Sequence, residues 1–102
     1  MKKLEEREVS EKLKTLRDWT HDGGTIVKKY KFPNFRKAIK FVGMVADVAE
    51  ELNHHPTIVI NYNRVTLSLT THSQGGLTGN DFRAAALIDG LLQKDEDFFA
   101  KR

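Results

Sequence analysis

Segment 57–70 is the stretch that most restricts what this chain can fold into. Two short runs in it alternate larger apolar side chains with polar or smaller ones: Ile58, Ile60 and Tyr62 against Thr57, Val59 and Asn61, then Val65, Leu67 and Leu69 against Thr66, Ser68 and Thr70. A period of two is that of a β-strand. The short Tyr62-Asn63 connection can join only antiparallel neighbours, so the segment predicts a β-hairpin.

An earlier segment predicts a second hairpin. The run from Thr25 to Phe32 is rich in β-branched and aromatic residues and follows the turn signal Asp22-Gly23-Gly24. We expect a short first strand before this turn. Alternation turns Tyr30 and Phe32 inward and the lysines beside them outward.

The strongest helix signal lies between the two hairpins. Pro33-Asn34 ends the earlier strand and caps a helix that runs to about Leu52. Its predicted apolar stripe consists of Phe35, Ile39, Val42, Val45, Ala49 and Leu52. Pro56 excludes a helical continuation through His55, so Pro56 is expected to stop the helix.

Two further helices flank the hairpins. Val9, Leu13 and Leu16 recur at helical spacing, with Ser10 as the expected N-cap and the residues before Val9 frayed. The last helix begins at Thr78-Gly79-Asn80-Asp81, which fits a capping box with Asp in place of Glu. Its predicted apolar residues are Phe82, Ala85, Ala86, Ile88 and Leu92, and a charged, loosened tail from Lys94 to Arg102 follows.

The element order, helix, hairpin, helix, hairpin, helix, predicts one α+β domain over residues 1–102. Its two hairpins would share a four-stranded antiparallel sheet, with three helices packed on one face. Such an open sheet has two edge strands with unpaired backbone groups. A small domain often covers them with a second copy, so we expect a homodimer or homotetramer.

Composition narrows the function classes. The 102 residues contain no cysteine, which excludes disulfides, thiolate nucleophiles and sulfur-bound zinc. Met1-Lys2-Lys3 is followed by charged residues where a signal peptide needs an apolar run, and no segment is long enough to span a membrane. We expect a cytoplasmic protein with no membrane partner. The 17 basic and 14 acidic residues balance too closely for a dedicated nucleic-acid binder.

The segment Asn53-His54-His55-Pro56 and the later His72 hold three of the four histidines. If the hairpin folds back, they can meet, and imidazoles suit acid–base work because they titrate near neutral pH. A histidine in the last turn of a helix can also cap free carbonyls, and three imidazoles can bind zinc. Adjacent histidines diverge and no His-Glu-x-x-His spacing is present, so we rank acid–base work above metal binding. His21 is given no role.

The joint pattern is more specific than any single residue. Glu50-x3-His54-His55-Pro56, then Tyr62, His72 and Asp81, resembles the signature of the pterin-4a-carbinolamine dehydratases, and the likeness extends from Trp19 to about Ile88. The resemblance implies an oligomeric enzyme that removes water from a 4a-hydroxytetrahydropterin to give quinonoid dihydropterin. It also implies tetrahydrobiopterin recycling beside an aromatic amino acid hydroxylase, with no cofactor and no metal.

The resemblance also implies roles for six residues. His54 and His72 become the leading acid–base pair, with His55 in the same pocket to orient substrate or share proton transfer. Glu50, Asp81 and Trp19 become substrate-binding candidates. Each of these three has a plainer alternative: an exposed helix carboxylate, a helix-start acid and a core anchor.

Animal relatives in this family also act as a dimerisation cofactor for a homeodomain transcription factor. A non-catalytic protein-binding role, similar to that of a transcriptional coactivator, is therefore the alternative function.

Overall fold

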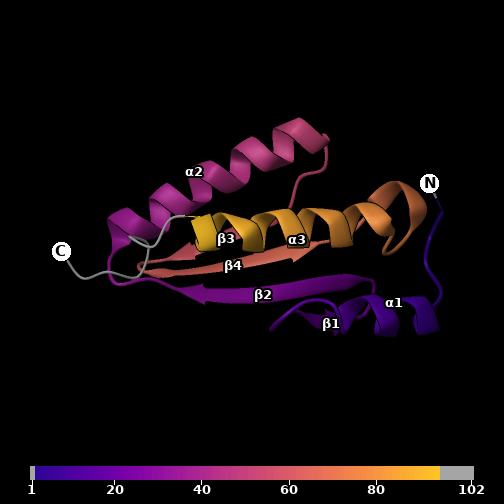
Figure 1. The fold of residues 1–102 in the computed structure, drawn as a ribbon. Helices are drawn as coiled ribbons and strands as arrows, with labels where there is room; N and C mark the ends of the chain where they lie inside the picture. Colours follow the sequence, from indigo (N-terminus) through magenta and orange to yellow (C-terminus); the bar gives the residue numbers. More distant parts are fainter. Residues whose placement is uncertain (1, 95–102) are drawn as a thin grey trace.

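The computed structural model describes residues 2–94. Its elements in chain order are α1 (Glu6–Leu13), β1 (Thr20–Asp22), β2 (Thr25–Lys31), α2 (Phe35–Leu52), β3 (Thr57–Asn61), β4 (Arg64–Leu69), the short 3-10 helix η1 (His72–Gln74) and α3 (Gly79–Lys94). The strands form one antiparallel sheet in the order β1-β2-β4-β3. The predicted α+β class is confirmed, with three helices and a four-stranded antiparallel sheet (Figure 1).

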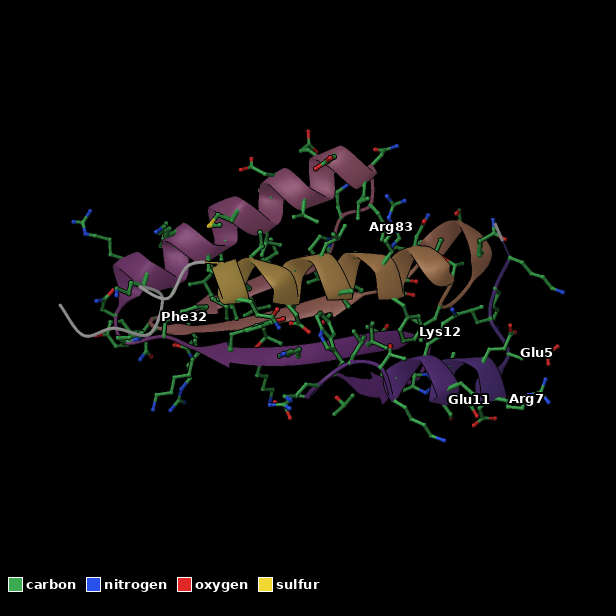
Figure 2. The ribbon with its side chains drawn as sticks, in the orientation of Figure 1. Glu5, Arg7, Glu11, Lys12, Phe32 and Arg83 are labelled. Atoms are coloured by element: carbon green, nitrogen blue, oxygen red, sulfur yellow. The ribbon has the colours of Figure 1, made fainter. Side chains whose placement is uncertain are left out.

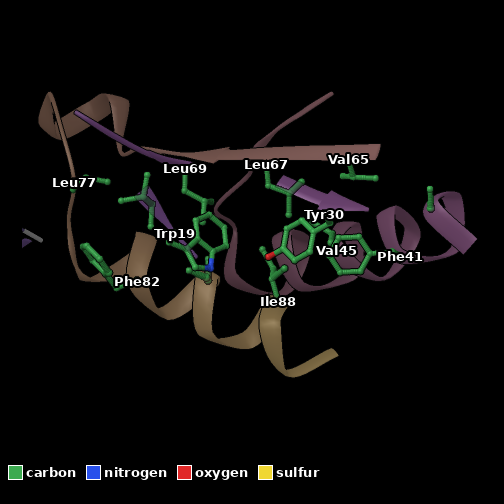
Figure 3. Packing of buried hydrophobic residues seen from close by; sticks show 14 of the residues in the cluster. Trp19, Tyr30, Phe41, Val45, Val65, Leu67, Leu69, Leu77, Phe82 and Ile88 are labelled. Atoms are coloured by element: carbon green, nitrogen blue, oxygen red, sulfur yellow. The ribbon is translucent and has the colours of Figure 1, made fainter. Parts of the chain in front are cut away.

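The core lies between the sheet and its helices (Figure 3). Ile26, Leu67 and Leu69 supply it from the central strands, and Phe41, Val45 and Ile88 supply it from α2 and α3. The aromatic rings of Tyr30, Phe32 and Phe41 pack together at one end, with centroids 4.8 Å apart for Tyr30–Phe41 and 5.0 Å apart for Phe32–Phe41, both pairs tilted. Lys29 and Lys31 point to solvent as their alternation predicts.

Both ends of α2 have a local cause. The Asn34 side chain accepts a hydrogen bond from the Lys37 backbone N–H at 2.9 Å, so the predicted N-cap is confirmed. The helix ends at Leu52, again as predicted, but Pro56 is not what stops it. Asn53 adopts a left-handed conformation with φ of 50°, which asparagine tolerates better than most residues and which turns the chain out of the helix.

The predicted apolar stripe of α2 is wrong in its first two turns. Phe35 is 50% exposed and Ile39 is 41% exposed, whereas Ala38 and Phe41 are fully buried. The cause is tertiary, because the ring of Phe41 packs on Tyr30 and Phe32 and so decides which side of the helix faces the sheet. The later positions Val45 and Ala49 are buried as predicted.

The predicted start of α1 is also wrong. The helix begins at Glu6, with Glu5 rather than Ser10 at the N-cap, and Glu5 and Glu8 form a reciprocal capping box. Acidic residues in this first turn also favour the helix dipole. Figure 2 shows charged side chains of this segment, Glu5, Arg7 and Glu11 among them, pointing to solvent, while Val9 is buried in the core.

The second hairpin and α3 follow the prediction closely. β3 and β4 pair antiparallel across the Tyr62-Asn63 turn, where Tyr62 has φ of 53°. Ala86 is exposed, contrary to expectation, and Ala84 takes the buried position on α3. The predicted tail lies outside the described residues except for Lys94, the last residue of α3. No described helix has the length and apolar content needed to cross a membrane.

Candidate active site

Three segments meet at one end of the domain. They are the exit of α2, the loop that follows β4, and the first turn of α3 (Figure 1). Five of the six predicted site residues come from these segments. Arg83, from the first turns of α3, lies at this end too, and its side chain is exposed (Figure 2).

His54 and Asp81 form the buried contact of this region. His54 Nε2 lies 2.5 Å from Asp81 Oδ1, which joins the exit of α2 to the first turn of α3. The Asp81 side chain is completely buried and only 11% of the His54 side chain is exposed. The His54 backbone N–H donates to the Ala49 carbonyl, but its imidazole binds the carboxylate rather than the free helix carbonyls.

The second oxygen of Asp81 is held by two donors. The Thr71 hydroxyl donates to Oδ2 at 2.8 Å, and the Thr78 backbone N–H donates to the same atom at 2.9 Å. The Thr78 bond is one of the two bonds of the predicted capping box, whereas the Thr78 hydroxyl oxygen accepts from the Asn80 backbone N–H, at 3.3 Å. Asp81 is therefore a helix-start acid and a histidine partner at once, through different oxygens.

His55 makes the corresponding contact on the surface. Its Nε2 lies 2.5 Å from Glu50 Oε2, with 55% of the His55 side chain and 77% of the Glu50 side chain exposed. The two adjacent rings therefore bind two different carboxylates. Adjacent histidines were predicted to diverge in this way.

His72 opens η1 and its side chain is exposed. The loop around it is closed by Thr71 and Gly76, whose backbones pair as an isolated bridge, and by Gly75, whose φ of 73° suits the turn. No hydrogen bond joins the His72 ring to another residue within 2–94. His72 follows directly on Thr71, which binds Asp81, so the chain brings its backbone to the His54–Asp81 pair.

Trp19 lies elsewhere, as the core anchor that was its alternative role. It is 6% exposed, and its Nε1 donates to Asp89 Oδ2 at 2.9 Å. Lys28 Nζ and the Tyr30 hydroxyl donate to Asp89 Oδ1 at 3.0 and 2.7 Å. Burial, with the hydrogen bond and charge of Asp89 as smaller causes, raises the pKa of Tyr30 above its ordinary value.

A hollow of about 840 Å³ borders this second carboxylate. Its lining includes Leu16, Arg17, Lys28, Asp89 and Gln93, and it contains none of the predicted site residues. In residues 2–94 no three histidine, aspartate or glutamate side chains converge as a metal site would require.

The arrangement suits proton transfer. Imidazole titrates near neutral pH, so it can donate or accept a proton, and a buried carboxylate that binds one ring nitrogen orients the other.

Sequence reasoning missed three residues that build the region. Asn53 carries a usable signal, since asparagine is common just beyond a helix end; Thr71 and Asp89 carry none, because their partners lie 10 and 59 or more residues away in the chain.

The sequence pattern of the pterin 4 alpha carbinolamine dehydratase family matches residues 2–91. A relative from Metallosphaera sedula is 43% identical over 91 residues, which cover 89% of this chain and 95% of the relative. One from Chloroflexus aurantiacus is 48% identical over 92 residues, covering 90% of this chain and 99% of the relative. Both carry a provisional pterin-4-alpha-carbinolamine dehydratase name.

Solved structures agree. A crystal structure of a transcriptional coactivator/pterin dehydratase from Brucella melitensis superposes with a TM-score of 0.84 at 37% identity, covering 87% of this chain and 97% of the other. A pterin dehydratase-like RuBisCO assembly factor of the alpha-carboxysome shares the fold, with a TM-score of 0.63 at 23% identity and coverage of 74% and 89%. This chain therefore belongs to the pterin 4 alpha carbinolamine dehydratase family.

Proposed function

We propose that this protein removes water from a 4a-hydroxytetrahydropterin to give quinonoid dihydropterin. The observation that carries the proposal is His54, which is bound through Nε2 to a buried carboxylate beside a second imidazole. Family membership supplies the substrate class. The product suits the recycling of tetrahydrobiopterin after an aromatic amino acid hydroxylase has used it.

The chemistry needs one acid and one base. The acid protonates the hydroxyl that leaves carbon 4a, while the base takes the proton from ring nitrogen 5 as the new double bond forms. We assign these two tasks to His54 and His72. An ordinary histidine pKa of about 6.5 keeps both protonation states available, and each positioned group typically contributes on the order of 10² to 10⁴ in rate.

His55 and Glu50 are assigned to substrate binding. The two side chains are 2.5 Å apart and both are exposed to solvent. An exposed ion pair contributes little free energy, so each side chain can leave its partner to bind an arriving ligand. A pterin carries ring nitrogens and amino groups that a carboxylate and an imidazole can bind. Asp81 is assigned to orienting His54 rather than to binding substrate, because its side chain is completely buried.

A dehydratase assay on the purified protein tests the proposal. Generating the 4a-hydroxytetrahydropterin in a stopped-flow mixer and following its absorbance gives the uncatalysed rate, to which the protein is then added. We expect acceleration at catalytic protein concentrations, and loss of it in the double variant His54→Ala/His72→Ala. No acceleration by the folded wild-type protein would reject the proposal.

We also propose self-association through the β3 edge. Among residues 2–94, β3 pairs with β4 alone, and Val59, Ile60 and Tyr62 around it are 54%, 39% and 64% exposed. Pairing two copies along this edge would satisfy its backbone groups and cover these side chains. Light scattering at micromolar concentration should give twice or four times the 11.7 kDa chain mass; the chain mass itself would reject this proposal.

The non-catalytic alternative has one observation in its favour. Phe35 and Ile39 leave an apolar area exposed on the first turns of α2, where another protein's helix could pack. The Brucella melitensis relative carries both a coactivator and a dehydratase name. Absence of dehydratase activity would leave this binding role as the function to pursue.

A further inference from the structure

We propose that the outer face of the sheet binds a small ligand that carries a di- or triphosphate group. The binding site is a basic cluster formed by Lys29, Lys31 and Arg64, and the hollow that these side chains line contains none of the residues assigned to the dehydratase site. The proposal therefore goes beyond the proposed function and does not depend on it. It is carried by the strand register, by the lining of the hollow and by the charges around it.

Strand alternation places the basic cluster on the face of the sheet that points away from the core. Tyr30 on β2 and Val65 on β4 are buried against the helices. Lys29 and Lys31 flank Tyr30 in the sequence, so they point to the other face. Arg64 precedes Val65 and points the same way. All three basic side chains are exposed.

The register brings the three cations together. Lys31 and Arg64 are direct partners in the pairing of β2 with β4, where the Cβ atoms of facing residues lie about 4.5–5.5 Å apart. Lys29 lies two residues away along β2, at about 6.5 Å on the same face. Like charges that face each other directly across two strands destabilise a sheet. Lys31 and Arg64 therefore repel each other, and an anion bound between them would remove this repulsion.

No carboxylate within residues 2–94 neutralises the basic cluster. None of the ion pairs between described residues includes Lys29, Lys31 or Arg64. Lys28 shows the contrast on the same strand, because its inward-pointing ammonium group lies 3.0 Å from Asp89 Oδ1. The outward-pointing cations keep only water as a partner in the described part of the chain, so an arriving anion has no described ion pair to break.

A hollow of about 430 Å³ lies over the basic cluster. Its lining also includes Asn61 and Thr66, whose side chains can donate to phosphate oxygens, and Val59, which is apolar and 54% exposed. Asn61 faces Arg64 and Val59 faces Thr66 across β3 and β4, so the lining consists of two adjacent rows of one surface. Small-molecule sites typically have volumes of roughly 300–1,000 Å³.

The chemistry of this lining favours linked phosphoryl groups. The planar guanidinium of arginine binds phosphate oxygens in pairs, and lysine adds a point charge. One phosphoryl group fits between Lys31 and Arg64, and a second one linked to it comes within reach of Lys29. The organic part of the ligand then packs on Val59. This site lies at the start of β4, whereas the loop that carries His72 follows the other end of that strand.

NMR titration of the full-length nitrogen-15-labelled protein tests the site. Pyrophosphate, ADP and sulfate are added as sodium salts at matched ionic strength, and the backbone amide shifts are followed. We expect saturable shifts at Lys29, Lys31 and Arg64 with pyrophosphate and with ADP. Sulfate should bind at least about tenfold more weakly, because it fills only one of the two anion positions. Absence of saturable shifts at these residues up to millimolar pyrophosphate would overturn the proposal, and so would equal binding of sulfate.

Two matched double variants separate a site from attraction by bulk charge. Lys31→Gln/Arg64→Gln removes the facing pair, and Arg7→Gln/Lys12→Gln removes the same charge from exposed positions of α1 (Figure 2). We expect pyrophosphate affinity to fall at least about tenfold in the first variant and to stay within about twofold in the second. Equal losses would overturn the proposal. If the first variant does not fold, each of its single substitutions must weaken binding by about threefold.

Two further measurements set the limits of the proposal. A single-stranded oligonucleotide that binds at these residues, in the absence of binding by pyrophosphate and ADP, would overturn the assignment to a small ligand. Dehydratase assays on Lys31→Gln/Arg64→Gln should give wild-type kcat and KM. A loss of activity there would overturn the separation of the two sites, whereas an inactive wild-type protein that still binds pyrophosphate would reject only the dehydratase function.

Discussion

His54 and His55 are neighbours in the chain, and each binds a carboxylate oxygen through Nε2 at 2.5 Å. The surroundings of the two contacts are opposite. His54 and Asp81 are 11% and 0% exposed, whereas His55 and Glu50 are 55% and 77% exposed. Equal distances therefore do not imply equal strength, because water competes for the exposed pair and salt screens it.

This difference in exposure assigns the buried contact to orienting an imidazole and the exposed contact to binding substrate. A carboxylate shielded from water and held by two further donors keeps one geometry, which a proton-transferring group needs. A solvated pair can open and accept a new partner, which suits a binding role. Each of the following measurements either breaks this contrast or sharpens it.

Activity should show the largest contrast. We expect His54→Ala and His72→Ala each to lower kcat by at least about tenfold, the effect of losing a positioned acid or base. His55→Ala should raise KM more than it lowers kcat, while His21→Ala, a change on the exposed strand β1, should change neither. The contrast fails if steady-state kinetics give His54→Ala and His55→Ala the same kcat loss.

Stability should separate the two carboxylates. Asp81→Ala leaves buried donors without an acceptor, so we expect a loss of about 1–3 kcal/mol in the free energy of unfolding. Glu50→Ala removes an exposed partner and should stay within about 0.5 kcal/mol. Urea denaturation followed by circular dichroism measures both, and equal losses would remove the physical basis of the contrast.

Asp89 sharpens the contrast as a second, partly buried carboxylate, whose side chain is 20% exposed. The pKa of Tyr30 is raised in the folded protein, so above the unfolded pKa of about 10 only the unfolded state loses the proton. Stability is therefore retained below pH 10 and lost as the pH rises beyond it, by about 1.4 kcal/mol at pH 11. Urea midpoints between pH 8 and 11 should fall less in Tyr30→Phe than in wild type.

The matched control for this measurement is Tyr62→Phe, whose side chain is 64% exposed at the β3–β4 turn. It should retain the alkaline loss of the wild-type protein. If both variants behave as wild type, the Tyr30–Asp89 contact does not contribute to stability in the way its burial indicates.

The salt dependence of activity should show a smaller difference between the two histidine–carboxylate pairs. The exposed His55–Glu50 contact is screened within a Debye length of about 8 Å at physiological ionic strength. The effect of Glu50→Gln on kcat/KM should be no more than about tenfold and should shrink as sodium chloride is raised to 1 M. The effect of Asp81→Asn should be nearly independent of salt, and parallel salt curves would contradict this assignment.

Chelation should have no effect. The proposed mechanism gives every proton transfer to imidazole, so dialysis against EDTA should leave the rate within error. A rate that collapses and returns with zinc would make the three histidines ligands, because His54 and His55 would then have to leave their carboxylates.

Local signals were sufficient for much of the fold. The alternation in residues 57–70 and the turn at Tyr62-Asn63 predicted the hairpin that β3 and β4 form, and Asn34 predicted the start of α2. These features depend on residues close in sequence, so their energetics can be read locally. The N-cap of α1 was missed because Glu5 is an uncommon cap that works here through its reciprocal bond with Glu8.

Only tertiary structure decided the face of α2 and the partners of the histidines. Phe35 and Phe41 are equally apolar, and the choice of Phe41 for the core depends on rings contributed by β2 and the residue after it. The site residues were named from their joint pattern, but no local rule says that His54 binds Asp81, 27 residues away, or that Thr71 donates to the same carboxylate. The sequence by itself determined which groups were available for proton transfer; the packing of α2, α3 and the loop after β4 decided which carboxylate is shielded from water and therefore which histidine it can hold.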